Sequence, residues 1–224
     1  MKTVALVPAR SGSKRIANKN ILDFCGKPLI SWTIEQALAT PRLSDVVVST
    51  DDPKIAEISL STGATVPFLR PRELATDSAS SIDVIIHALA NLPEVTHLLL
   101  LQPTSPLRLT SDIEEMIDFF LESSAKSMVS MSMVKKPPAW MFEITKANTL
   151  KRIRKLKSNL GSKESRDLYM PNGAMYFATR EFLLEYKTFI TEATMAYIMP
   201  PERSVDIDTP FDWTIAEFLM TNSL

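Results

Sequence analysis

The sequence contains little glycine, a single cysteine and no long apolar run. Its five glycines are at least 12 residues apart, so neither a P-loop nor the dinucleotide-binding pattern GxGxxG can be written in it. The lone Cys25 excludes an intrachain disulfide and is typical of a reducing compartment. No apolar stretch approaches the roughly 20 residues needed to cross a bilayer. We therefore expect a cytoplasmic protein without membrane contact, which can meet phosphates through side chains, helix ends, a metal ion and one glycine at most.

The charge balance gives no sign of a polyanionic partner. Lys and Arg number 25 against 26 Asp and Glu, for a net charge of −1, and a chain this close to neutral has no general attraction for nucleic acid or acidic lipid. Hydrophobic residues at 45% and charged residues at 23% of the 224 positions are typical of a folded globular protein. This length fits one large domain spanning residues 1–224.

Short apolar runs alternate with amphipathic stretches through the first 125 residues. Apolar runs at 4–7, 46–48 and 98–101 read as buried strands, and runs apolar on both faces suit a parallel sheet covered by helices. Helical periodicity marks 30–39 and 111–121, the second with Ser111 and Glu114 as a candidate capping box. A last helix is predicted after Thr209, with Pro210 in its first turn. The pattern predicts an α/β fold with a mostly parallel sheet.

The middle of the chain breaks this alternation. Residues 128–134 alternate like a strand, whereas 146–166 are strongly basic and poorly periodic. We expect about 133–170 to form an excursion from the sheet that acts as a lid or a subunit contact. The basic run 151–157 could bind RNA, but it lacks the interleaved aromatic residues that stack on bases. We therefore rank nucleic-acid binding well below the binding of a small nucleotide.

The strongest functional signal directly follows the first predicted strand. Residues 8–20 carry four cations and no acid: Arg10, Lys14, Arg15 and Lys19. Ligands of open parallel sheets bind outside the carboxyl ends of the strands, and guanidinium, ammonium and backbone N–H groups suit a polyphosphate. A solvated basic loop is the alternative interpretation.

A second constellation near the carboxyl end contains Asp206 and Asp208. If residues 205–208 are extended, both carboxylates point to the same side. Such a pair suits Mg²⁺, which typically takes one or two protein carboxylates together with phosphate oxygens. The alternative is that Asp208 only supports the start of the last helix.

Three further segments carry polar groups near predicted strand ends. Residues 49–52 could hold a ligand or cap a helix, Gln102 could read a base edge or a hydroxyl, and residues 70–81 place two arginines ahead of a hydroxyl cluster that could simply cap a helix. His87 and His97 have no third nitrogen or sulfur ligand at useful spacing, so no zinc site is expected.

Several of these segments together resemble the acylneuraminate cytidylyltransferases, the CMP-sialic acid synthetases. The resemblance covers nearly the whole chain and is carried, in order, by residues 8–14 with 19–20, 49–51, 70–81, 101–108, 171–176 and 206–209. Residues 66–71, 140–142 and 200–206 look closer to the legionaminic acid branch. The chain departs from the family pattern at Arg15, Ala17 and Met170.

The resemblance implies a Rossmann-like nucleotide-diphospho-sugar transferase fold, a three-layer sandwich, and a homodimer in which the excursion reaches the partner. It implies that the anomeric hydroxyl of a nine-carbon nonulosonic acid attacks the α-phosphate of CTP, with Mg²⁺ or Mn²⁺ as cofactor. The implied ligands of the nucleotide are Arg10, Ser13, Lys14, Lys19, Asn20, Arg70 and Ser81. Gln102, Arg166 and Tyr176 would bind the sugar acid, Asp206 and Asp208 the metal, and Arg10, Lys19 and Asp208 would be catalytic.

Two rival functions remain open on the sequence alone. One is a cytidylyltransferase for the eight-carbon sugar acid of lipopolysaccharide. The other is a nucleotide-binding protein that has kept the pocket and lost turnover.

Overall fold

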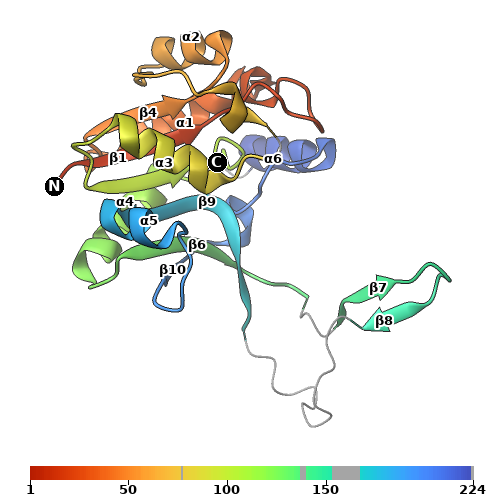
Figure 1. Cartoon of the computed structure of the whole chain (residues 1–224). Coiled ribbons are helices and arrows are strands. Elements are labelled where there is room, and N and C mark those ends of the chain that lie inside the picture. Colours follow the sequence, from red (N-terminus) through yellow and green to blue (C-terminus); the bar gives the residue numbers. More distant parts are fainter. Residues whose placement is uncertain (77, 137–139, 153–166, 223–224) are drawn as a thin grey trace.

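The computed structural model describes residues 1–76, 78–136, 140–152 and 167–222. A six-stranded sheet forms its centre, in the order β10 (Met195–Ile198), β6 (Ser127–Met133), β9 (Tyr169–Thr179), β5 (His97–Leu101), β1 (Thr3–Pro8) and β4 (Asp45–Ser49) (Figure 1). β9 runs antiparallel to β5 and β6, whereas the β10–β6, β5–β1 and β1–β4 pairs are parallel. The predicted mostly parallel sheet is confirmed.

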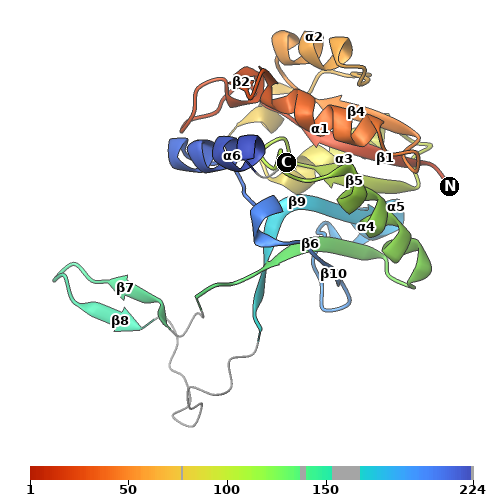
Figure 2. The same ribbon diagram turned by 180° about the vertical axis from the view of Figure 1, so that it is seen from behind.

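Helices cover both faces of this sheet. On one face α1 (Leu29–Leu38), α2 (Pro53–Ser61) and α4 (Thr110–Glu122) pack through a core that includes Ile34, Ile55 and Met116. On the other face α3 (Ser81–Asn91) and α5 (Arg180–Tyr186) pack through Ile85, Leu89 and Leu183 (Figures 1 and 2). Strands that are buried on both faces need apolar residues at every position, which explains the continuous apolar runs. The expected three-layer α/β architecture is confirmed.

A smaller core joins the last helix to the amino-terminal part of the chain. α6 (Pro210–Asn222) packs with the hairpin β2 (Asp23–Phe24) and β3 (Lys27–Pro28) around Phe24, Leu29 and Ile207. Its start is as predicted, because the Thr209 hydroxyl accepts a hydrogen bond from the Asp212 N–H at 3.3 Å. This packing brings the carboxyl-terminal segment to the edge of the sheet where β1 ends.

The capping box predicted for the helix at 111–121 was wrong. α4 begins at Thr110, and Asp112 rather than Glu114 accepts the capping hydrogen bond, from the Leu109 N–H at 2.9 Å. Residues 205–208, for which we considered an extended backbone, lie outside the strands of the sheet. The Ile207 N–H donates to the Thr104 carbonyl oxygen at 2.8 Å, so this segment is held by the loop after β5 rather than by a strand of the sheet.

The predicted excursion contains a separate hairpin, β7 (Phe142–Ile144) and β8 (Leu150–Arg152), which lies away from the central sheet (Figures 1 and 2). Apolar side chains of the hairpin and of the residues just before it face solvent: Ile144, Leu150 and Trp140 are each about 70% exposed. Residues 137–139 and 153–166, the rest of this basic stretch, lie outside the described residues. Among the helices that the structure describes, none has the length and apolar character to span a membrane.

Candidate active site

The basic loop after β1 and the segment before α6 meet at the carboxyl edge of the sheet. Lys19, in the short helix η1 (Lys19–Ile21), donates a hydrogen bond through Nζ to the carbonyl oxygen of Ile207, 188 residues away in sequence. The same Nζ lies 3.5 Å from Oδ1 of Asp208, and Nη1 of Arg15 lies 3.0 Å from Oδ2 of that carboxylate. Arg15, a departure from the family pattern, therefore pairs directly with a proposed metal ligand.

Lys19 and Asp208 differ in their exposure to solvent. The Lys19 side chain is 12% exposed, whereas that of Asp208 is 52% exposed. Burial lowers the pKa of Lys19 from its ordinary value, and the charges of Asp208 and Asp206 oppose that shift. A buried ammonium beside two carboxylates is held in place and little screened by water, so its charge acts strongly on a neighbouring anion.

A cavity of about 340 Å³ opens above this contact and gathers most of the predicted phosphate ligands. We call it the basic cavity; its lining includes Arg10, Ser13, Lys14, Arg15, Lys19, Asn20, Gln102, Thr104 and Asp208. Thr104 was not predicted individually as a site residue, although it lies in the 101–108 segment that carries part of the family resemblance. Cations from one loop and a carboxylate from the other end of the chain thus share one cavity.

Hydrogen bonds to the end of β4 fix the shape of the basic loop. The N–H and hydroxyl of Ser11 donate to the two carboxylate oxygens of Asp51 at 3.1 and 2.7 Å. The Asn20 amide nitrogen donates to the Arg10 carbonyl oxygen at 3.1 Å. Asn20 therefore braces the loop from inside, in addition to lining the cavity. The other acid of this segment, Asp52, caps α2, as one of the two alternatives predicted.

A second cavity of about 290 Å³ shares Pro8, Arg10 and Gln102 with the first and adds Arg70 and Ser81. We call it the middle cavity. The Arg70 side chain is buried and donates to Ser49 through Nε, at 3.1 Å to the hydroxyl, and through Nη2 to the carbonyl oxygen. Burial lowers the pKa of Arg70 to about 10, which leaves it protonated at neutral pH. Arg70 therefore also holds the end of β4 in place.

A third cavity, of about 310 Å³, lies next to the middle cavity and is more apolar. It shares Ser81, Leu100 and Gln102 with its neighbour and continues along Tyr176, Lys187 and Phe189. Gln102 thus borders all three cavities, where its amide can meet more than one part of an extended ligand. Lys187 and Phe189 could not be singled out from the sequence. Their segment follows a helix, whereas the sequence signals came from loops that follow strands. Arg166, the other predicted sugar-acid ligand, lies outside the described residues.

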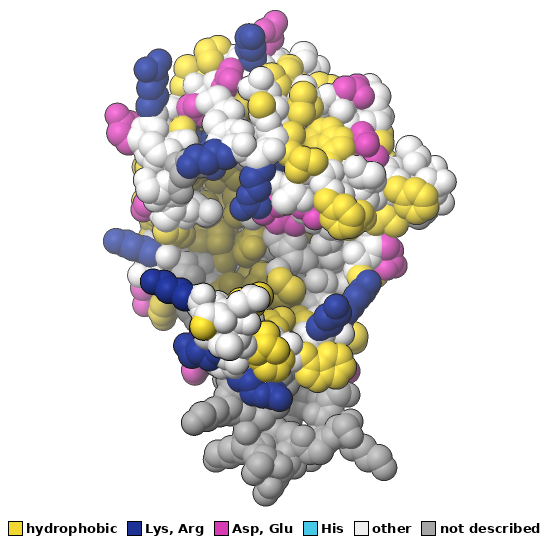
Figure 3. Space-filling view, turned by 90° about the vertical axis from the view of Figure 1, so that its right-hand side faces the viewer, with side chains coloured by type: hydrophobic (Ala, Val, Ile, Leu, Met, Phe, Trp, Pro, Cys, Tyr) yellow, Lys and Arg dark blue, Asp and Glu magenta, His cyan; other side chains and the backbone are white. Residues whose placement is uncertain are grey.

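Figure 3 views the molecule from the side toward which β1 and β5 run in Figure 1. A hollow with a hydrophobic floor lies in this face, and Lys and Arg side chains stand around its rim (Figure 3). A concave site with an apolar interior and a few charged groups at its mouth is the usual form of a small-molecule site.

Asp206, two residues before Asp208, packs with its carboxylate against Gly173 of β9. Its Oδ1 is buried and has no partner of good hydrogen-bond geometry among the described residues. Burial raises the pKa of Asp206, and the Asp208 carboxylate adds to the rise, while the Thr104 hydroxyl and Lys19 oppose it. A buried carboxylate oxygen without a partner, next to a second carboxylate, is a suitable ligand for a hard divalent cation. The residues therefore fit Mg²⁺ or Mn²⁺. The proposed site has two carboxylates. A larger cluster, of three or more His, Cys, Asp or Glu side chains that could hold a metal, does not occur within the described part of the chain.

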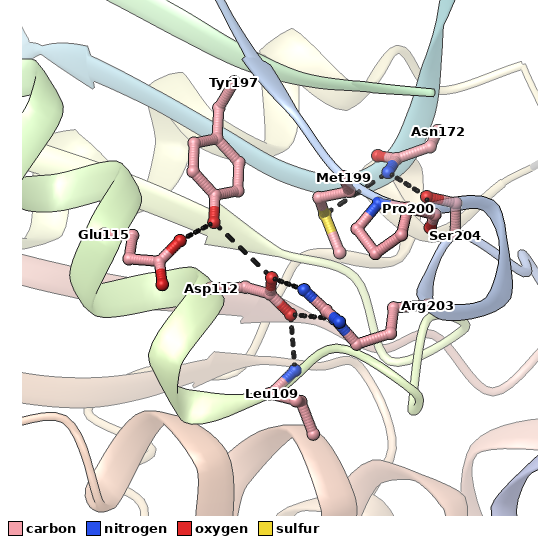
Figure 4. Close-up of polar contacts among 9 residues, drawn as sticks. All are labelled: Leu109, Asp112, Glu115, Asn172, Tyr197, Met199, Pro200, Arg203 and Ser204. Atoms are coloured by element: carbon pink, nitrogen blue, oxygen red, sulfur yellow. Dashed lines mark hydrogen bonds and ion pairs between the residues drawn. The ribbon is translucent and has the colours of Figure 1, made fainter. Parts of the chain in front are cut away.

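A hydrogen-bond network centred on the buried Asp112 anchors the segment that carries the two aspartates (Figure 4). Arg203, at the end of η4 (Pro201–Arg203), donates to both carboxylate oxygens of Asp112 at 3.0 and 2.8 Å. Asp112 is 1% exposed and also receives the Leu109 N–H. The Tyr197 hydroxyl donates to Glu115 at 2.7 Å, from β10 to the same helix. Bidentate pairing of this kind fixes orientation as well as distance.

We expect Asp112→Ala to lower the free energy of unfolding by about 2–4 kcal/mol, because it leaves the half-buried Arg203 guanidinium and the Leu109 N–H without their acceptor. Urea denaturation followed by circular dichroism measures this. The matched control on the same helix is Asp118→Ala, whose partner Arg42 is 55% exposed; exposed pairs of this kind contribute about 0–1 kcal/mol. Equal losses for the two variants would contradict the anchoring role of Asp112.

Comparison with known proteins agrees with this geometry. A family model described as cytidylyltransferase matches residues 4–213. The chain is 36% identical to the CMP-N,N'-diacetyllegionaminic acid synthase of Legionella pneumophila, over 98% of this chain and 97% of that protein. It is 33% identical to a pseudaminic acid cytidylyltransferase of Campylobacter jejuni over 98% and 96%. With an N-acylneuraminate cytidylyltransferase of Escherichia coli it shares 38% identity, over 96% of this chain and 51% of that longer protein.

Solved structures show the same fold. A CMP:2-keto-3-deoxy-manno-octonic acid synthetase complexed with CTP superposes over 100% of both chains, with a TM-score of 0.75 at 19% identity. A 4-diphosphocytidyl-2C-methyl-D-erythritol synthase of Anaerococcus prevotii superposes over 99% of both, with a TM-score of 0.68 at 12% identity. The family model spans nearly the whole chain, and relatives above 30% identity cover it from end to end. The chain therefore belongs to the cytidylyltransferase family.

Proposed function

We propose that this protein transfers the cytidylyl group of CTP to a nine-carbon nonulosonic acid of the legionaminic or N-acetylneuraminic type. The observation that carries the proposal is the single cavity in which the basic loop meets Asp208. The relatives named for legionaminic, N-acylneuraminic and pseudaminic acids support this substrate class. Among these acids we favour the legionaminic type, since that relative is 36% identical over almost its whole length, against 33% for the pseudaminic relative over a similar span.

In the proposed reaction, the anomeric hydroxyl oxygen of the sugar acid attacks the α-phosphorus of CTP. A new P–O bond forms, the bond from the α-phosphorus to the bridging oxygen breaks, and pyrophosphate leaves with the electron pair. Arg10, Lys14 and Lys19 would hold the triphosphate and balance the charge that grows on the leaving group. Asp208, half exposed at the cavity, is our candidate to accept the hydroxyl proton.

The remaining cavities divide the substrates between them. In this proposal the nucleoside lies in the middle cavity between Arg70 and Ser81, and the sugar acid lies along Tyr176 in the third, more apolar cavity. Gln102, at the junction, would orient both for attack. Asp206 and Asp208 would hold Mg²⁺ or Mn²⁺, and the bound cation would neutralise phosphate charge and polarise the α-phosphate.

A substrate panel tests the function. Pyrophosphate release is measured with CTP, Mg²⁺ and, in turn, a legionaminic, an N-acetylneuraminic, a pseudaminic and the eight-carbon octulosonic acid. Turnover with the legionaminic or the N-acetylneuraminic acid supports the proposal, with the highest kcat/KM expected for the legionaminic type, whereas turnover with the pseudaminic acid alone would contradict it. The eight-carbon acid is the second candidate because of the 0.75 TM-score to its synthetase. Turnover with that acid alone would replace the proposal, and no turnover with any acid would favour a nucleotide-binding protein without catalysis.

We also propose that the hairpin β7–β8 is a contact between two copies of the chain, since its apolar residues are exposed. Sedimentation velocity of the intact chain is expected to give a dimer. The double variant Ile144→Ser/Leu150→Ser is expected to be a monomer, because it removes apolar surface from the contact. Leu60→Ser, which changes an exposed leucine on α2, is the control and should remain a dimer. A dimer that survives the double variant would contradict this assignment.

A further inference from the structure

Strand β9 carries a large bulge next to the proposed metal site. Val129 of β6 pairs with Tyr176 of β9, and Met131 pairs with Pro171. Between these pairs β6 has only Ser130, whereas β9 has the four residues 172–175. Bulges of this kind redirect a strand locally and are frequent next to active sites. This one turns the backbone of β9 toward the segment that carries Asp206.

Buried hydrogen bonds hold the bulge in one shape. The Ser130 hydroxyl accepts from the Met175 N–H at 2.8 Å and donates to Asn172 Oδ1 at 2.6 Å. Asn172 Oδ1 also accepts from the Ala174 N–H at 3.1 Å. The fully buried Arg108 donates through Nη1 to the Ala174 carbonyl oxygen at 2.8 Å. The polar groups that the bulge removes from the ladder are thus paired by side chains, which keeps the bulge rigid.

The bulge touches the aspartate segment at two points. Asn172 Nδ2 donates to the Ser204 hydroxyl at 2.9 Å, two residues before Asp206 (Figure 4). Gly173 has φ +81°, and a Cβ placed on it would lie 3.1 Å from Oδ2 and 3.5 Å from Cγ of Asp206. The Asp206 carboxylate therefore occupies space that any other residue at position 173 would need.

We propose that Gly173 and Asn172 are positioning residues for the carboxylate of Asp206. Gly173 provides the surface on which the carboxylate rests, and Asn172 ties down the backbone through Ser204. The inference deepens the proposed function, since it rests on Asp206 as a metal ligand. Supporting contacts of this kind orient the ligands of many metal sites, and their loss typically weakens metal binding by about 10–100-fold.

The test is direct binding of Mn²⁺ in the presence of CTP and the absence of sugar acid, followed by electron paramagnetic resonance. We expect Gly173→Ala to raise the dissociation constant for Mn²⁺ by about tenfold. The matched control is Gly26→Ala. Gly26 has φ +91°, so alanine is equally strained there, but no atom lies within 4 Å of the added Cβ. Gly26→Ala should lower the melting temperature comparably and leave Mn²⁺ binding within twofold of the wild-type value.

Two more variants separate the possible failures. Asp206→Ala shows whether Asp206 binds the metal at all: unchanged Mn²⁺ binding there would overturn the metal assignment in the proposed function, and this inference with it. If Asp206→Ala weakens binding but Gly173→Ala matches Gly26→Ala, the positioning role alone is overturned. Should Gly173→Ala fail to fold, Ser204→Ala removes the tie from Asn172 together with the hydrogen bond that the Ser204 hydroxyl donates to the Pro200 carbonyl oxygen at 2.8 Å, and we expect it to weaken Mn²⁺ binding roughly two- to tenfold. Wild-type affinity in Ser204→Ala would then contradict the role of Asn172.

Discussion

Lys19→Ala is expected to lower kcat by about 10²–10³-fold, the usual loss when one preorganised donor to a developing charge is removed. Lys19 is buried, and its ammonium is fixed between the Ile207 carbonyl oxygen and Asp208 at the floor of the basic cavity. An ammonium held in this way needs no reorganisation as charge builds on the phosphates. The measurement is pyrophosphate release at saturating CTP and sugar acid.

The control for Lys19 is Lys54→Ala, an exposed lysine on α2 outside all three cavities. It changes the net charge by the same amount, so the two variants differ only in where the ammonium is lost. Lys54→Ala should keep wild-type kcat. A Lys19→Ala enzyme with wild-type kcat would show that the reacting phosphates lie elsewhere.

Asp208→Asn is expected to lower kcat by at least about 10²-fold, because a cation that stabilises phosphoryl transfer contributes several kcal/mol. The amide keeps the size of the carboxylate but loses its charge, both for the cation and for the proton of the attacking hydroxyl. Some of this loss should be recovered at high Mg²⁺ concentration, where binding is driven by mass action. The measurement is kcat as a function of Mg²⁺ concentration.

A carboxylate at the start of α2 provides the control for Asp208. Asp52 caps α2 through its side chain, and asparagine caps helices about equally well. Asp52→Asn therefore removes one negative charge close to the basic loop without disturbing the helix, and it should retain wild-type kcat and Mg²⁺ dependence. If Asp208→Asn behaves in the same way as Asp52→Asn, Asp208 neither binds the metal nor takes the proton.

The layers of the fold could be predicted because they depend on local patterns. Apolar runs such as Val46–Val48 are typical of strands covered on both faces, and α6 begins where Thr209 and Pro210 predict. The start of α4 could not be predicted in the same way. Ser111 and Glu114 fit a capping box by spacing, but Asp112 takes that role, and its carboxylate also pairs with Arg203, 91 residues away.

The location of the candidate site could be predicted from the sequence, but several contacts that shape it could not. The rule that ligands bind at the carboxyl ends of parallel strands selected the loop after β1, the 101–108 segment and Gln102. The second contacts of Asn20 and Arg70, which brace the loop and the end of β4, cannot be read from composition. The bulge at Gly173 depends on Ser130 and on the path of residues 204–208, so only the three-dimensional structure reveals it.

The structure of the protein with CTP and Mn²⁺ bound tests the central claim most directly, since anomalous scattering locates the cation independently of the nucleotide. We predict that the triphosphate lies in the basic cavity against Arg10, Lys14 and Lys19, with Mn²⁺ between its oxygens and the carboxylates of Asp206 and Asp208. Nucleotide bound in another part of the molecule, or Mn²⁺ remote from both aspartates, would contradict the account.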